Sequence, residues 1–147
     1  MSDGRSYPTR PILAASVAVF RDGKVLLAAR TKPPGPALFS LPGGLVEVGE
    51  TLQEAALREL DEEVAVTAEI VGFAGHVEVI QRDASGAVER HFVVSAFAGR
   101  WVSGEPQTGP EAQAVLFADP DEIGDLNTTP GLGPIVQRAR ELVEGRA

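Results

Sequence analysis

Three glutamates, Glu59, Glu62 and Glu63, lie in a stretch whose apolar residues follow a helical spacing over residues 52–64. On a helix that turns about 100° per residue, Glu63 falls near 40° and Glu62 near −60° from Glu59, so the three carboxylates share one face. Like charges this close on a helix repel one another, and a hard divalent cation with oxygen ligands relieves the repulsion. The pattern therefore predicts a metal site, and the alternative is an acidic helix face in contact with solvent.

The residues around this face also suit a binding site. Gly43 and Gly44 precede the helix, and their unrestricted backbone can approach a ligand closely. Thr51 and Glu54 have the spacing of a capping box, which predicts that the helix begins after Thr51. Arg58 is four residues from Glu54 and from the glutamate at position 62, so it can pair with either.

The elements that must position these side chains can be read from the remaining pattern. Two apolar runs flank Asp22-Gly23 and predict a β-hairpin. Residues 32–36 hold three prolines and a glycine and must form a loop. A turn is expected at residues 83–86. The remaining apolar runs predict strands around residues 66–71, 77–80, 91–97 and 114–117, and a second helix over residues 134–143. Because several connections resemble hairpins, the expected fold class is α+β, with helices packed on a mixed β-sheet.

Length, charge and composition restrict the function further. The 147 residues fit one domain, which we place at residues 11–147 behind a flexible tail of residues 1–10. The chain has no cysteine, so a metal must be held by oxygen ligands or by the two histidines. Its net charge of −8 disfavours a nucleic-acid polymer as partner, but not a small phosphorylated ligand bridged by a cation. No apolar run reaches the length of a membrane span or a signal core, so we expect a cytoplasmic protein with no membrane partner.

The stretch from Gly44 to Val66 resembles the signature of the Nudix hydrolases. That signature begins with a glycine, five residues of any type, a glutamate and seven residues of any type. Arg-Glu, an aliphatic residue, one residue of any type and Glu-Glu follow. It ends with one residue of any type, a glycine and an aliphatic residue. The matching residues here are Gly44, Glu50, Arg58, Glu59, Leu60, Glu62, Glu63 and Val66. Ala65 stands where the family has its final glycine. A left-handed helix end at Ala65 costs roughly 1 kcal/mol, or else the helix ends in another geometry.

The resemblance, which extends over residues 11–143, implies an α/β/α sandwich and a metal-dependent hydrolase. Glu59, Glu62 and Glu63 would bind Mg²⁺ or Mn²⁺, assisted by the carbonyl of Gly43. The metal would polarise a phosphate and help to generate the attacking water. Arg58 would hold a glutamate in position, and the general base would be one of these glutamates or a residue from a later loop.

Six further positions are candidates for the site. Glu111 lies in a loop before the last predicted strand, where Nudix enzymes often present an acidic residue; the alternative is a surface glutamate. Arg30 ends a predicted strand and could bind phosphate, and Gly44 could contact substrate through its backbone. Glu47 is close enough to the signature to support the site. His76 and His91 are weaker candidates for metal ligands, because the family uses glutamates.

The resemblance defines the substrate poorly. No proline lies between Pro42 and Pro106, and the only tyrosine is Tyr7, so the downstream markers of several Nudix subfamilies are absent. General similarity to short bacterial proteins grouped with ADP-ribose pyrophosphatases favours ADP-ribose or a related nucleoside diphosphate derivative. The alternatives are a nucleoside triphosphate pyrophosphohydrolase and a non-catalytic nucleotide-binding module. The expected partner is a small nucleotide-type molecule, and the oligomeric state stays open, with a homodimer among the options.

Overall fold

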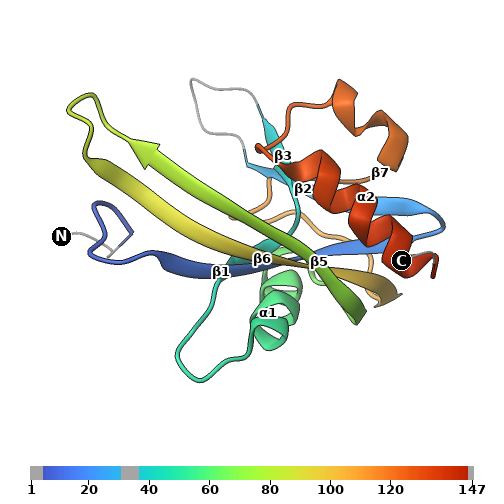
Figure 1. Cartoon of the computed structure of the whole chain (residues 1–147). Coiled ribbons are helices and arrows are strands. Elements are labelled where there is room, and N and C mark those ends of the chain that lie inside the picture. The colour runs from blue at the N-terminus through green and yellow to red at the C-terminus, as the bar shows by residue number, and fades with distance from the viewer. Residues whose placement is uncertain (1–4, 31–36, 146–147) are drawn as a thin grey trace.

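A computed structural model describes residues 5–30 and 37–145 and shows a twisted β-sheet with one α-helix on each face (Figure 1). Within these residues the strands are β1 (Ile12–Arg21), β2 (Lys24–Arg30), β3 (Leu38–Ser40), β4 (Gly43–Leu45), β5 (Thr67–Arg82), β6 (Val88–Ser103) and β7 (Ala114–Ala118). The helices are α1 (Leu52–Val64), the 3₁₀-helix η1 (Pro120–Asp125) and α2 (Leu132–Val143). The predicted α+β class, with helices on a mixed sheet in an α/β/α arrangement, is confirmed.

The strand order is β3-β2-β1-β6-β5, with β4 paired to β1 and β7 paired to β2. β1 and β6 are parallel, whereas every other strand pair in the described chain is antiparallel. The predicted hairpin is confirmed as β1–β2. Its turn residues Asp22 and Gly23 have φ of 52° and 78°, as a tight two-residue hairpin turn requires.

The β5–β6 hairpin is much longer than the short strands that the sequence predicts. Each strand has 16 residues, and the register shifts between Ile70 and Gly72 and again between Phe73 and Gly75. Such β-bulges break the alternation of apolar residues while the strands stay paired, so one strand looks like two short runs. The predicted turn at residues 83–86 is confirmed, because the Asp83 carboxylate accepts the N–H groups of Ser85 and Ala87.

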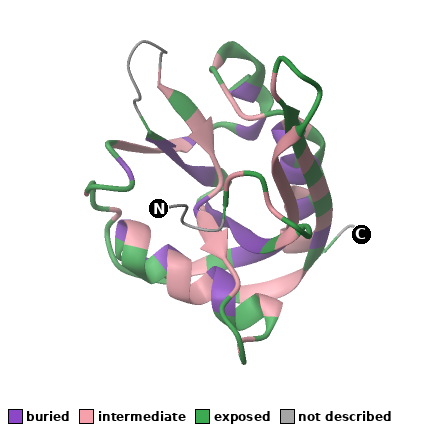
Figure 2. Ribbon diagram, turned by 90° about the vertical axis from the view of Figure 1, so that its left-hand side faces the viewer, coloured by how far each residue is buried: buried purple, intermediate pink, exposed green. Residues whose placement is uncertain are grey.

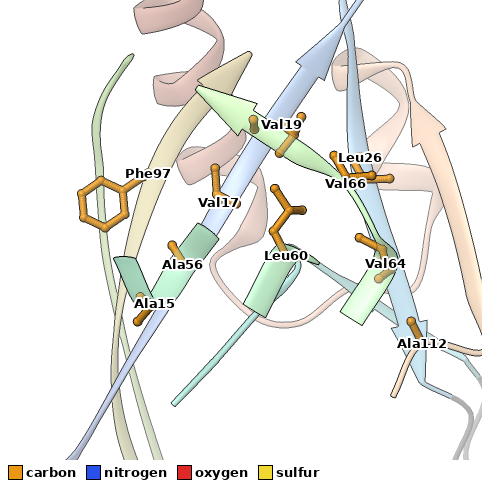
Figure 3. Close-up of a cluster of buried hydrophobic side chains, with 13 residues drawn as sticks. Ala15, Val17, Val19, Leu26, Ala56, Leu60, Val64, Val66, Phe97 and Ala112 are labelled. Carbon is orange, nitrogen blue, oxygen red and sulfur yellow. The ribbon is translucent and has the colours of Figure 1, made fainter. Parts of the chain in front are cut away.

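The hydrophobic core has two halves because successive side chains of a strand point to opposite faces. Val17 and Val19 of β1 pack in the half beneath α1, whereas Ala18 and Phe20 pack in the half beneath α2. Figure 3 shows Leu60 of α1 among the valines of the first half. Exposed residues lie in the turns and also alternate with partly buried ones along β5 (Figure 2). Burying a leucine side chain contributes about 1.5–3 kcal/mol, so this packing firmly fixes α1 and its acidic face on the sheet.

The described part of the predicted tail, residues 5–10, contains neither helix nor strand. Tyr7 nevertheless contacts the β5–β6 hairpin: its hydroxyl donates to Asp83 at 2.8 Å and its N–H donates to the Glu89 carbonyl at 2.8 Å. The loop predicted at residues 32–36 lies outside the described residues. In the part of the chain that the structure describes, no helix is long and apolar enough to cross a membrane.

Candidate active site

Helix α1 begins and ends as its local sequence dictates. The Thr51 hydroxyl accepts the Glu54 N–H at 3.1 Å, and the Glu54 carboxylate accepts the Thr51 N–H at 2.9 Å, so the predicted capping box is confirmed. At the other end, Ala65 has φ 60° and ψ 38°, and its N–H donates to the Asp61 carbonyl. Of the two geometries that the sequence leaves open for Ala65, the structure has the left-handed one.

Arg58 is the centre of a hydrogen-bond network on the acidic face. Its Nε and Nη2 donate to the two carboxylate oxygens of Glu50 at 2.7 and 2.9 Å. Its Nη1 donates to Glu59 at 2.9 Å and to Glu62 at 3.0 Å, and Nη2 also donates to the Leu45 carbonyl. Of the two partners considered for Arg58, Glu62 is the observed one. The bidentate pair with Glu50 crosses from the helix to the preceding loop, so Arg58 ties the loop to α1.

This network has clear electrostatic consequences. The hydrogen bonds from Arg58, helped by the Glu47 N–H, lower the pKa of Glu50 to about 2. The same bonds raise the pKa of Arg58, so its charge is permanent. Arg58 therefore offsets the repulsion expected between Glu59 and Glu62. The helical wheel predicts that Arg58 can reach Glu62, but it does not show that one guanidinium bridges Glu59 and Glu62.

Glu63 has different surroundings. Its carboxylate accepts the Gly43 N–H at 3.1 Å, and the structure gives it no ion pair within the described chain. Burial raises the pKa of Glu63 to about 7; the Gly43 bond and the Arg30 charge oppose this rise, and Glu111 and Glu59 add to it. The repulsion from Glu59 that the sequence predicts is thus only a small part of this rise.

The glycines of β4 allow the close approach between strand and helix. A side chain on Gly44 would place its Cβ 2.6 Å from both carboxylate oxygens of Glu59. A Cβ on Gly43 would overlap with the Ala15 carbonyl and the Ser16 side chain of β1. Glycine is therefore required at both positions by space, not by an unusual φ.

Two cavities lie near the acidic face of α1. An apolar cleft of about 360 Å³ lies between the sheet and the start of α2, and a second cavity of about 420 Å³ lies beside the end of α1. Gly43 and Gly44 line the apolar cleft, and the same residues contact Glu63 and Glu59. Glu62 and Glu63 line the second cavity. A molecule in the cleft that extended over β4 would therefore reach the acidic residues.

The structure brings Glu111 and Arg30 to this site, as the sequence predicts. Glu111 lines the second cavity with Glu62 and Glu63, and the Arg30 Nε donates to the Glu111 carbonyl at 3.0 Å. Glu47 is exposed and lies 3.8 Å from Arg58, at the edge of the network. The histidines are elsewhere: neither His76 nor His91 lines either cavity, and His76 lies 3.3 Å from Glu78 on the same strand.

The donor set suits a hard divalent cation, but its members do not yet converge. Within the described residues, no three acidic or histidine side chains are close enough to enclose a metal ion. Arg58 explains this, because its Nη1 holds Glu59 and Glu62 in its own hydrogen bonds. The group as a whole offers only oxygen ligands, and Glu63 is a half-buried carboxylate for which the described chain shows no ion pair. Mg²⁺ or Mn²⁺ would suit such a group of ligands.

Two features of the site are absent from the sequence prediction. Glu50 belongs to the signature, but its bidentate pair with Arg58 depends on the path of the loop between β4 and α1. The apolar cleft also escapes prediction, because its walls come from strands far apart in the chain. One signal was available: Ser16 interrupts an otherwise apolar strand between two alanines at alternate positions, Ala14 and Ala18.

The sequence and the fold of this chain are similar to those of known proteins. The NUDIX domain model matches residues 10–139. An ADP-ribose pyrophosphatase from Methanocaldococcus jannaschii is 33% identical over 116 residues, which cover 79% of this chain and 66% of that protein. An RNA pyrophosphohydrolase from Gluconobacter oxydans is 45% identical over 65 residues, or 44% of this chain and 36% of that protein. The chain thus spans less than two thirds of the length of each of these curated relatives. The solution structure of the E. coli ORF135 protein is 28% identical with a TM-score of 0.71, and the match covers 93% of this chain and 94% of that one.

Proposed function

The chain belongs to the NUDIX family, and from that premise we propose that it hydrolyses the pyrophosphate bond of a nucleoside diphosphate derivative, with ADP-ribose as the favoured substrate. One observation carries the proposal. The β4 glycines line an apolar cleft on one side and contact the acidic side chains of α1 on the other. A nucleoside in the cleft would thus have its phosphates beside the acidic side chains.

Glu59, Glu62 and Glu63 are the proposed ligands of a divalent cation, with the Gly43 carbonyl as a further oxygen donor. Members of this family generally use divalent metal ions, and we propose Mg²⁺ or Mn²⁺. Such an ion supplies positive charge that neutralises the phosphate oxygens and activates water. The protein needs this positive charge, because its net charge of −8 otherwise repels a phosphorylated substrate.

The chain's own residues have distinct proposed roles. Arg58 holds Glu59 and Glu62 in place and ties the loop at Glu50 to the helix. Arg30 lies near Glu63 and is the proposed contact for a substrate phosphate. The proton of the attacking water passes to one of the helix glutamates or to Glu111, which lines the same cavity. The substrate separates into a nucleoside monophosphate and a second phosphorylated fragment.

The cleft supports a neutral nucleoside with a short phosphate chain. Among the described residues, no charged side chain lines the cleft. A diphosphate diester carries less charge than a triphosphate, so Arg30 and one or more bound cations have less to neutralise. The name of the M. jannaschii relative points to the same substrate.

A substrate panel tests this proposal. The purified chain is assayed with Mg²⁺ against ADP-ribose, NADH, dinucleoside polyphosphates, and normal and oxidised nucleoside triphosphates. We expect the highest kcat/KM with ADP-ribose, which would yield AMP and ribose 5-phosphate. If the kcat/KM for a triphosphate is at least tenfold higher than that for ADP-ribose, the protein is instead a nucleoside triphosphate pyrophosphohydrolase. Nucleotide binding without turnover of any substrate would make it a non-catalytic module.

A further inference from the structure

Ser16 is an unusual residue on the cleft side of β1. Side chains at alternate positions of a strand share a face, so Ser16 points to the same side as Ala14 and Ala18. Ser16 lines the cleft, and only 6% of its surface is exposed. Within residues 5–30 and 37–145 it is the single polar residue that is buried to this degree.

The Ser16 hydroxyl has no hydrogen-bond partner among the residues that the structure describes. In the same part of the chain, no side-chain oxygen or nitrogen that is completely cut off from solvent lacks a partner. The unpaired hydroxyl must therefore keep an opening, and the cleft that Ser16 lines provides it. A hydroxyl that opens only onto the cleft makes no hydrogen bond that stabilises the fold, and alanine stands two positions before and two positions after it.

The place of Ser16 indicates which part of a ligand it would meet. Ser16 is directly opposite Gly43 in the β1–β4 register, and the two residues are so close that a Cβ on Gly43 would overlap with the Cβ of Ser16. Gly43 also donates to Glu63, so Ser16 lies where the cleft joins the acidic site. The ligand group at this junction is the one attached directly to the pyrophosphate, which in a nucleotide is the sugar of the nucleoside.

We propose that Ser16 is a specificity-determining residue whose hydroxyl pairs with a ribose hydroxyl of the bound nucleotide. This inference rests on the proposed function, since it assumes that a nucleotide occupies the cleft with its phosphates over β4. A serine hydroxyl can donate and accept, so it can pair with a sugar hydroxyl in either direction. The residue would therefore select ribonucleotides over deoxyribonucleotides.

Calorimetric titration tests the inference with AMP, 2′-deoxy-AMP and 3′-deoxy-AMP as probes, in the presence of Mg²⁺. Wild-type protein should bind AMP about three- to tenfold more tightly than one of the two deoxy forms, the value of one neutral hydrogen bond. The Ser16→Ala variant should lose affinity for AMP by the same factor and should no longer discriminate. Its KM for ADP-ribose should rise more than its kcat falls, and its Tm without ligand should stay the same or increase.

Ser95→Ala is the matched control. Ser95 is a serine on the neighbouring β6 that pairs with Ala15 and His76 and does not line the cleft. This variant should keep the ribose preference of the wild type. The inference is overturned if Ser16→Ala keeps the preference, if both variants lose it equally, or if wild-type protein binds the three probes equally or not at all. Failure of the proposed function appears separately, as ribose-selective binding without turnover of ADP-ribose.

Discussion

The three glutamates of the acidic face are equivalent in sequence but not in structure. Glu59 and Glu62 share one nitrogen of Arg58, whereas Glu63 is held by a backbone N–H. A metal ion must therefore compete with Arg58 for two of its proposed ligands, whereas the third, Glu63, has no hydrogen bond to Arg58. Glu63 is the residue at which charge and burial conflict most.

This conflict makes the stability of the metal-free protein depend on pH. The pKa of Glu63 rises from an ordinary 4.5 to about 7 in the folded chain, so the folded state binds its proton more tightly than the unfolded state. Stability from this group is fully present below pH 4.5 and is lost as the pH rises through 7. Glu63→Gln keeps an acceptor for Gly43 but cannot ionise. In EDTA it should therefore be more stable than wild type at pH 8, by about 1 kcal/mol after allowance for solvent screening.

Urea unfolding of both proteins at pH 5 and pH 8 measures this difference. The advantage of the variant should be smaller at pH 5 than at pH 8. An equal difference in the free energy of unfolding at the two pH values would mean that Glu63 does not titrate in this range.

Gly44 provides a second test at the level of one residue. Gly44→Ala places a methyl group against the Glu59 carboxylate, which must then move away from its proposed position. Turnover should fall by at least about tenfold, because displacements near 1 Å in a catalytic group are costly. Gly124→Ala is the control, since a Cβ on Gly124 meets nothing within 4 Å. Equal activity of the two variants would show that Glu59 tolerates displacement.

At the level of elements, the end of α1 carries a strained residue. Ala65 occupies the left-handed region, where an L-residue with a side chain is disfavoured and glycine is not. Ala65→Gly should therefore stabilise the protein by up to about 1 kcal/mol, measured by chemical unfolding. Ala55→Gly, within the same helix, should destabilise it by a similar amount or more, because glycine weakens a helix interior. Destabilisation by both variants would contradict the left-handed end.

The elements that the sequence predicts well are those with local causes. The capping box of α1 and the Asp22-Gly23 turn each involve neighbouring residues, so their patterns are visible in the chain. β3 and β4 have only three residues each and exist because of their pairing with β2 and β1. β5 looks broken in sequence because bulges shift its alternation. The site follows the same division: the glutamates of α1 are predicted, whereas the cleft and Ser16 depend on distant strands.

At the level of the whole molecule, the fold brings three separate chain segments to one site. α1 supplies the helix glutamates, β4 supplies the glycines between helix and cleft, and the loop before β7 supplies Glu111. The parallel pairing of β1 with β6 forms the floor of the cleft, next to the β1–β4 pair. A nucleotide can then lie with its neutral part on the sheet and its phosphates over the acidic residues.

The most direct test of this account is the metal dependence of hydrolysis, measured with the best substrate of the nucleotide panel. The wild-type protein should lose all activity in EDTA and regain it with Mg²⁺ or Mn²⁺. Glu62→Gln and Glu63→Gln should each reduce turnover by about 100-fold or more at saturating metal, because each removes a proposed metal-binding charge. Full activity in a chelated, metal-free sample, or near-normal turnover in both variants, would contradict the account and leave the acidic face of α1 as a surface in contact with solvent.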